Sequence, residues 1–176
     1  SFFMKVIFLD RDGVLNIPFL INGKSYAPKK KSEFKFYPYT KKNCNHLIKL
    51  GYTLIVITNQ PDISKGTLKF NELKKMHKKL KEELNIKKIY TSHSLNNKNI
   101  NRKPNPGLLI KAVKQFNINI NKSYMIGDRK KDMDAAKNIS CRSIFIDRNY
   151  HETKPKTQLY TCRSLNKNVK FIKKNK

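Results

Sequence analysis

Five short hydrophobic runs punctuate the chain, and polar residues follow each of them. The runs cover residues 6–9, 52–57, 88–91, 124–126 and 143–146. Apolar runs without alternation are typical of strands that are buried on both faces of a parallel sheet. The sequence therefore predicts a central, mainly parallel sheet, and residues 158–162 are expected to add a strand at its edge.

Segments with apolar residues at helical spacing lie between the runs. They predict helices over residues 40–50, 70–84, 108–116, 132–138 and 165–173. In the second of these, Leu73, Met76, His77, Leu80 and Leu84 form one apolar stripe. A histidine on such a stripe is expected in the core or at its boundary and not as a metal ligand. Strands that alternate with helices predict an α/β fold with right-handed crossovers.

Residues 17–39 break this alternation. The segment contains Pro18, Gly23, Pro28 and Pro38 and is too long for an ordinary loop between a strand and a helix. Long loops of this kind are usually functional or mobile, so the segment is a candidate lid over a substrate. Weak alternation in residues 32–37 allows a short edge element there.

Two carboxylates, Asp10 and Asp12, follow the first run and precede Gly13. An Asp-Gly pair by itself indicates a turn. However, ligands of open α/β sheets bind beyond the carboxyl ends of the strands, which is where these residues are expected. Two aspartates so close together repel unless a cation lies beside them, and Mg²⁺ prefers carboxylate oxygens.

Polar clusters also follow the other strands. They are Thr58, Arg102 with Lys103, and Asp128 with Asp132. Parallel strands bring all of these to one rim of the sheet. Each residue by itself has an ordinary structural explanation, so the signal lies in their combination.

Phosphomonoester hydrolysis would give each residue of these clusters a role. It needs an in-line nucleophile, a metal and cationic stabilisation of the phosphoryl oxygens. Asp10 is the candidate nucleophile and Asp12 the candidate acid–base. Asp10 and Asp128 are the candidate Mg²⁺ ligands, with the Asp12 carbonyl as a further ligand and Asp132 in support. Thr58 and Lys103 are candidates to contact the phosphate.

The composition sets further limits. The chain has 176 residues, a formal net charge of +27 and three scattered cysteines. Its length is that of one domain spanning residues 1–176, and no run is long enough to cross a membrane. The first run has no basic leader or cleavage site, so we expect no secretory signal. An odd number of scattered cysteines indicates free thiols in a reducing compartment, so a cytoplasmic protein is expected.

The positive charge alone would suggest a polyanion-binding protein. However, the lysines are spread along the whole chain, and no nucleic-acid-binding motif is present. We therefore expect weak, non-specific attraction of anions, including phosphorylated sugars, and no specific nucleic-acid binding.

Three motifs carry a resemblance to a known family. Residues 10–16 (DRDGVLN), 58–60 (TNQ) and 102–107 (RKPNPG) resemble the haloacid dehalogenase (HAD) phosphatases, in the branch of the heptose bisphosphate and histidinol-phosphate phosphatases. The resemblance implies a three-layer Rossmann-like fold without a large cap domain. It also implies substrate contacts from Asn59, Gln60, Arg102 and Arg129.

The chain departs from this branch in residues 91–102. The family commonly holds a structural zinc ion here, and the equivalent positions are Thr91, His93, Asn99 and Asn101. Structural zinc takes cysteine or histidine ligands, and only His93 qualifies. No structural Zn²⁺ is expected, so hydrogen bonds or packing must order this loop unless it is mobile.

The function expected from this resemblance is Mg²⁺-dependent hydrolysis of a small phosphorylated sugar, with a heptose bisphosphate as the first candidate, by a monomer. Histidinol phosphate is an alternative substrate. A non-enzymatic alternative is a HAD fold that has lost its activity and serves as a basic nucleic-acid-binding or scaffold protein.

Overall fold

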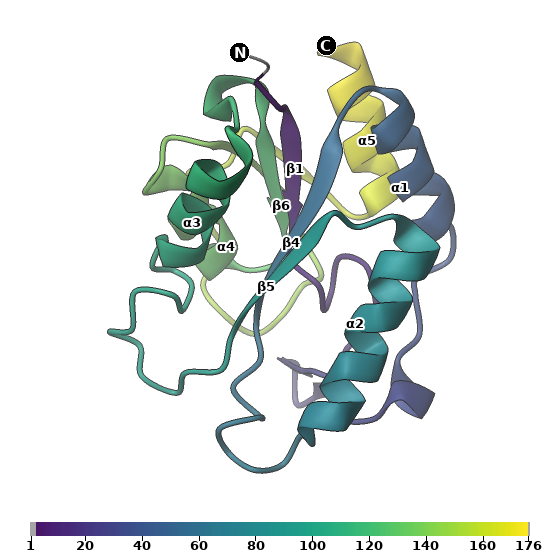
Figure 1. Cartoon of the computed structure of the whole chain (residues 1–176), viewed down its shortest axis with the longest axis vertical. Coiled ribbons are helices and arrows are strands. Elements are labelled where there is room, and N and C mark those ends of the chain that lie inside the picture. The colour runs from purple at the N-terminus through teal and green to yellow at the C-terminus, as the bar shows by residue number, and fades with distance from the viewer. Residues whose placement is uncertain (1–2, 176) are drawn as a thin grey trace.

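The computed structural model describes residues 3–175 and is built around a six-stranded parallel sheet (Figure 1). The strand order is β5-β4-β1-β6-β7-β8, and every neighbouring pair is parallel. The strands are β1 (Val6–Leu9), β4 (Thr53–Asn59), β5 (Lys88–Ser92), β6 (Tyr124–Gly127), β7 (Arg142–Ile146) and β8 (Tyr160–Cys162).

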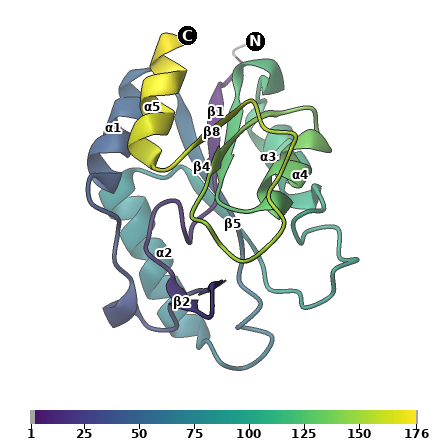
Figure 2. The same cartoon turned by 180° about the vertical axis from the view of Figure 1, so that it is seen from behind.

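Five α-helices cover both faces of the sheet (Figures 1 and 2). Helices α3 and α4 lie on one face, and α1, α2 and α5 lie on the other. Their bounds are α1 (Thr40–Lys49), α2 (Phe70–Leu84), α3 (Gly107–Phe116), α4 (Lys130–Lys137) and α5 (Leu165–Lys174). The predicted three-layer α/β fold is confirmed.

Strand β1 shows why its sequence is continuously apolar. Ile7 and Leu9 pack into the core beneath α1, α2 and α5, whereas Val6 and Phe8 pack into the core beneath α3 and α4. Successive side chains of a strand point to opposite faces, so a strand covered on both sides must be apolar at every position.

The predicted elements are all present, with small shifts of their ends. β4 extends to Asn59, so Thr58 and Asn59 belong to the strand and do not lie beyond its tip. Helix α4 begins at Lys130, two residues before the predicted start, which brings Asp132 into its first turn. Two short 3₁₀ helices, η1 (Lys31–Glu33) and η2 (Ile120–Lys122), complete the chain elements.

The segment predicted to be irregular contains an antiparallel hairpin of β2 (Phe19–Ile21) and β3 (Lys24–Tyr26). Its turn residues, Asn22 and Gly23, both have positive φ, at 51° and 76°. An Asn-Gly pair between two strand-forming segments is the sequence signal for such a two-residue turn. The sequence analysis did not predict this hairpin. The weakly alternating stretch after it forms η1 and a single bridge from Asn16 to Phe36.

The strand order creates a crevice at the middle of the sheet. The chain builds β1, β4 and β5 outward in one direction and then returns to place β6 on the other side of β1. Ligands of open α/β sheets bind at this switch point, beyond the carboxyl ends of the strands. The residues that follow β1 and β6 are Asp10 and Asp128, and the Asp10 amide donates to Ile126 O at 3.0 Å.

The three cysteines are buried and free. Burial raises the pKa of the Cys44 and Cys141 thiols to about 12, which keeps both in the unreactive thiol form. No helix in residues 3–175 has the length and apolar character needed to cross a membrane.

Candidate active site

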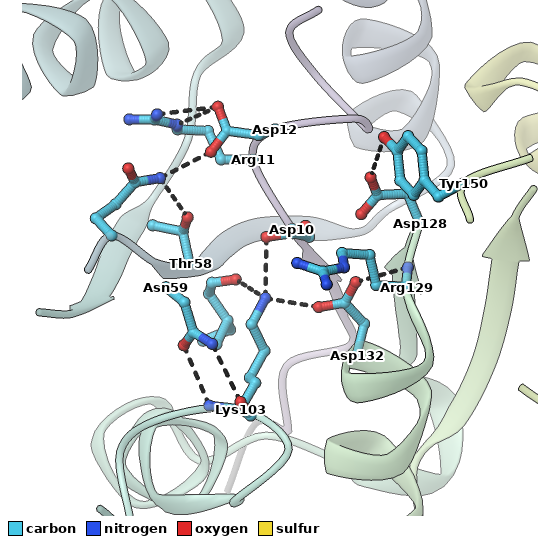
Figure 3. Close-up of polar contacts among 12 residues, drawn as sticks. Asp10, Arg11, Asp12, Thr58, Asn59, Lys103, Asp128, Arg129, Asp132 and Tyr150 are labelled. Atoms are coloured by element: carbon cyan, nitrogen blue, oxygen red, sulfur yellow. Dashed lines mark hydrogen bonds and ion pairs between the residues drawn. The ribbon is translucent and has the colours of Figure 1, made fainter. Parts of the chain in front are cut away.

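Three buried carboxylates meet at the switch point (Figure 3). Asp10 follows β1, Asp128 follows β6, and Asp132 lies in the first turn of α4; each offers an oxygen within 4.8 Å of the other two. We refer to these three residues as the acid cluster. Such a concentration of negative charge inside a protein requires a compensating cation.

Lys103 supplies part of this compensation. Its ammonium lies 2.9 Å from Asp10 Oδ1 and 2.7 Å from Asp132 Oδ1, and it donates to Ile57 O at 2.7 Å. Burial alone would lower the pKa of Lys103, but the two carboxylates outweigh burial and raise it. Lys103 therefore stays protonated and forms an ion pair with Asp10.

Asp128 lies on the other side of the cluster, and among the described residues it forms no ion pair with a lysine or arginine. Its Oδ2 accepts from the Tyr150 hydroxyl at 2.6 Å, while within the described residues its buried Oδ1 has no hydrogen-bond partner. Burial and the charges of Asp10 and Asp132 raise the pKa of Asp128 well above its usual range. An unpartnered carboxylate oxygen among other carboxylates fits a hard divalent cation such as Mg²⁺.

Gly13 makes room for this arrangement. Its φ is +86°, and a Cβ there would collide with the Asp128 carboxylate and the Tyr150 hydroxyl. The glycine of the first motif is thus required both for the turn and for the approach of Asp128.

Asp12 lies outside the acid cluster and is surrounded by donors (Figure 3). Arg11 donates to Oδ1 from Nε at 3.2 Å and from Nη2 at 2.9 Å, and Asn16 donates to the same oxygen at 2.8 Å. Gln60 donates to Oδ2 at 2.8 Å. We call Arg11, Asn16 and Gln60 the donor network of Asp12.

The residues at the end of β4 connect the two halves of the site. Gln60 also donates to Thr58 Oγ1 at 2.9 Å, and both side chains are buried. The Asn59 amide makes two hydrogen bonds of 3.1 Å with the Lys103 backbone, as donor to its carbonyl and acceptor from its amide. Asn59 therefore fixes the chain segment that carries Lys103.

A cavity of about 180 Å³ opens above these residues. Its wall includes Asp10, Asp12, Lys103 and Asp128 from the site and Ser25, Tyr26 and Ala27 from the end of the hairpin. The remaining lining residues are mostly polar or charged, namely Asn59, Pro61, Asp62, Lys65, Arg129 and Lys131. The segment predicted as a lid thus borders the cavity.

The two arginines predicted to contact substrate differ in their surroundings. Arg129 lines the cavity and forms a two-pronged ion pair with Glu152, at 2.8 and 3.2 Å. Arg102 is not among the lining residues, and its guanidinium donates to Ser94 O at 2.6 Å and to Asn97 Oδ1 at 3.0 Å. Burial and, next, the charge of Arg129 lower the pKa of Arg102, so the two guanidinium groups are electrostatically coupled.

Hydrogen bonds order the loop of residues 91–102. Besides the Arg102 contacts, Asn105 donates to the carbonyls of Asn97 and Asn99, each at 2.8 Å. His93 packs edge-on against Phe70, with ring centroids 6.4 Å apart. Of the two alternatives left open for this loop, order by hydrogen bonds or packing and mobility, these contacts favour the first.

Tyr150 and Lys131 are among the residues of the site that were not predicted, as are Arg11 and Asn16 of the donor network. Tyr150 comes from the loop after β7, more than twenty residues from its acceptor Asp128, and nothing local in the sequence marks it. Lys131 lies beside Asp132 in a motif already recognised, but one lysine among so many carried no signal. Burial, followed by the charge of Arg129, lowers the pKa of Lys131 to about 8.

Comparison with known proteins now identifies the family. The family model described as haloacid dehalogenase-like hydrolase matches residues 9–146, from the last residue of β1 to the end of β7. The chain belongs to the haloacid dehalogenase-like hydrolase family. The resemblance inferred from the three short motifs is confirmed.

Two of the named relatives of this hydrolase are heptose bisphosphate phosphatases. It is 34% identical over 149 residues to D-glycero-beta-D-manno-heptose-1,7-bisphosphate 7-phosphatase of Helicobacter pylori, covering 81% of this chain and 83% of the relative. It is 32% identical over 147 residues to D-glycero-alpha-D-manno-heptose-1,7-bisphosphate 7-phosphatase of Campylobacter jejuni, with 81% of each chain covered.

A solved structure supports the same fold. The D,D-heptose 1,7-bisphosphate phosphatase from B. bronchiseptica, complexed with magnesium and phosphate, superposes with a TM-score of 0.83. The alignment covers 98% of this chain and 100% of the other, at 21% sequence identity.

Proposed function

We propose that this hydrolase is a Mg²⁺-dependent phosphatase that removes the 7-phosphate of a D-glycero-D-manno-heptose 1,7-bisphosphate. One observation carries the proposal: Asp10 pairs with the cation Lys103 and lies near Asp128, whose buried Oδ1 has no hydrogen-bond partner among the described residues, at a cavity lined by both carboxylates and cations. The identity of about one third to heptose bisphosphate phosphatases over most of the chain supports this substrate class.

Asp10 is the proposed nucleophile. Lys103 holds Oδ1, which leaves Oδ2 to attack phosphorus and form an aspartyl-phosphate as the bond to the sugar oxygen breaks. Lys103 also neutralises part of the negative charge that the phosphate brings into the cavity. The hydroxyl of Thr58 is proposed to donate to the phosphoryl oxygens.

Asp10, Asp128 and Asp132 are the residues that would hold Mg²⁺, with Asp10 and Asp128 as direct ligands and the Asp12 carbonyl as a further one. When bound, the cation would offset the repulsion between the acid cluster and the phosphate. It would also give Asp128 Oδ1 the partner that it lacks among the described residues.

Asp12 is the proposed acid–base. In the first half-reaction it gives a proton to the leaving sugar oxygen, and in the second it takes a proton from the water that attacks the aspartyl-phosphate. Its position outside the acid cluster suits this role, because hydrogen bonds from the donor network, rather than a metal ion, would hold the carboxylate in place.

The substrate is proposed to be a bisphosphate because the cavity is lined by four cationic side chains as well as by four carboxylates. Lys65, Lys131 and Arg129 line it, and Arg102 is within electrostatic reach of Arg129. A second phosphate near the arginines would relieve their mutual repulsion. Histidinol phosphate carries an amine, which Lys65, Lys131 and Arg129 would repel and which only Asp62 outside the proposed catalytic residues would attract among the lining side chains. The relatives differ in the anomer they are named for, so both anomers belong in the test.

The protein is proposed to work as a single domain in the cytoplasm, where its three free thiols would stay reduced. A basic scaffold or nucleic-acid-binding protein would have no need for Asp128 with a buried unpartnered oxygen, because such a group costs stability.

The test is phosphate release from both anomers of the heptose bisphosphate, from histidinol phosphate and from a short 3′-phosphorylated DNA. We expect a clear preference for a heptose bisphosphate, dependence on added Mg²⁺, and loss of turnover to background in Asp10→Asn. That variant is isosteric, and its circular dichroism spectrum should match the wild-type spectrum. Absence of Mg²⁺-dependent phosphate release from every substrate would overturn the proposal.

A further inference from the structure

The side chain of Arg11 is buried in a way that the proposed chemistry does not explain. Its exposed fraction is 0%, although arginine is among the residues least often buried. It follows the nucleophile directly and turns away from the acid cluster, under the ring of Phe34, whose centroid is 5.2 Å from Cζ. A buried guanidinium needs acceptors for its five N–H groups.

The acceptors come from two elements. Arg11 donates from Nε and Nη2 to Asp12 Oδ1. Its Nη1 lies 3.2 Å from Nε2 of His77, in the middle of α2. A guanidinium can only donate, so His77 Nε2 must be the acceptor and its proton must lie on Nδ1. A histidine placed by its helical spacing at the core boundary thus touches the motif of the nucleophile, 66 residues away in the chain.

The surroundings of His77 favour this neutral acceptor. Burial, and after it the charge of Arg11, lower the pKa of His77 to about 3, so the imidazole is neutral at physiological pH. The residue faces a groove between α2 and β5 and not the acid cluster, so it is too remote to act on a phosphate itself.

We propose that His77 is a positioning residue for the acid–base carboxylate: it fixes Arg11, and Arg11 fixes Asp12. The chain from His77 through Arg11 to Asp12 Oδ1 leaves Oδ2 on the side of Gln60 and the cavity. Without an acceptor at position 77, Nη1 is left buried and unpaired, and Arg11 must move to find another partner. Asp12 then either loses its two hydrogen bonds from Arg11 or moves together with the Arg11 side chain.

This inference rests on the proposed role of Asp12 and is tested with whichever phosphomonoester the wild-type protein hydrolyses in the experiment above. His77→Leu should lower kcat by about ten- to a hundred-fold, as small misplacements of catalytic groups do, with KM within about two-fold of wild type. His77→Gln should recover most of the loss, because its amide oxygen can occupy the position of Nε2.

A double-mutant cycle shows whether His77 acts through Arg11. In an Arg11→Met background, His77→Leu should cause no further loss of kcat, because the residue that it fixes is gone. Additive losses, equal losses in His77→Leu and His77→Gln, or wild-type kcat in His77→Leu would each overturn the inference.

Leu80→Ala is the matched control, since Leu80 is buried on the same helix and its apolar side chain cannot accept a hydrogen bond from Arg11. It should lower the melting temperature and leave kcat unchanged at temperatures where the protein is folded. If His77→Leu does not give folded protein, His77→Met takes its place in the cycle. Failure of the proposed function would appear as inactive wild-type protein, whereas failure of this inference leaves the wild type active and Asp10→Asn inactive.

Discussion

Asp10 and Asp12 are two residues apart in the same loop, yet they belong to opposite kinds of environment. Asp10 joins two other buried carboxylates with one lysine among them, and an oxygen of Asp128 has no hydrogen-bond partner in the described chain. Asp12 has four hydrogen bonds from three side chains and needs no further partner. Lys103 offsets only part of the negative charge of the acid cluster, whereas neutral amides and a guanidinium hold both oxygens of the Asp12 carboxylate.

On the proposed roles, this difference would separate binding of a metal from transfer of a proton. A group that moves protons must stay free of strong metal coordination, and a metal ligand must stay deprotonated. Because amide and guanidinium donors hold Asp12, each carboxylate would have one of the two proposed tasks. The separation can be tested by changing one region and reading out the other.

The largest effect is expected for Asp12→Asn. The substitution removes the proton-transfer group, so kcat should fall by about 10²- to 10⁴-fold. The acid cluster is untouched, so the rise in melting temperature caused by Mg²⁺ should persist. Asp128→Asn is the counterpart and should abolish that rise. Loss of the Mg²⁺ effect in Asp12→Asn would show that the two regions are not separate.

The acid cluster should also make the stability of the metal-free protein depend on pH. The pKa of Asp128 is raised in the folded state, so its protonated form contributes stability that is present below the unfolded-state pKa and lost as pH rises through the folded-state value. Mg²⁺ can replace the lost proton. At concentrations about 100-fold above Kd it should stabilise by about 2.7 kcal/mol, or several degrees in Tm.

The measurement is Tm by circular dichroism, with and without saturating MgCl₂, near pH 5.5 and pH 8. The Mg²⁺-induced rise should be larger at the higher pH, because fewer protons compete for the cluster. Asp128→Asn carries no titrating group at this position and serves as the control, with a much weaker pH dependence. An equal rise at both pH values in the wild type would contradict the role of Asp128.

The smallest effect is expected for Gln60→Met, which weakens the donor network without removing a charge. Asp12 Oδ2 and Thr58 Oγ1 each lose a hydrogen bond, so kcat should fall by about ten-fold and stability by about 1 kcal/mol. The Mg²⁺-induced shift in Tm should equal that of the wild type. Reduced Mg²⁺ binding in this variant would mean that the network also supports the acid cluster.

Some parts of this site could be predicted because their signal is local. The apolar run of β1 and the carboxylates that follow it are adjacent in the chain, as are Gly127 and Asp128. The carboxyl ends of parallel strands lie at the same edge of the sheet. Once β1 and β6 are neighbours, Asp10 and Asp128 must therefore be close, whatever the conformation of other side chains. The hairpin at Asn22 and Gly23 had an equally local signal that was overlooked.

Other parts had no local signal. The Tyr150 hydroxyl reaches Asp128 from a loop whose path depends on how β7 and β8 pack. Arg102 lies in a recognised motif, yet its guanidinium is directed at Ser94 and Asn97 because the loop before it folds back. His77 was assigned to the core boundary, and its contact with Arg11 depends on the rotation of α2 against the sheet.

The sequence by itself determined the layers, the strand tips and the family, because these depend on periodicity and on short runs of neighbouring residues. Only the tertiary structure decided which side chains became partners: Asp128 with Tyr150, Lys103 with Asp132, and Arg11 with His77. The physical reason is that a hydrogen bond or ion pair depends on positions within a few tenths of an ångström. Such positions are set by the packing of elements that are far apart in the chain.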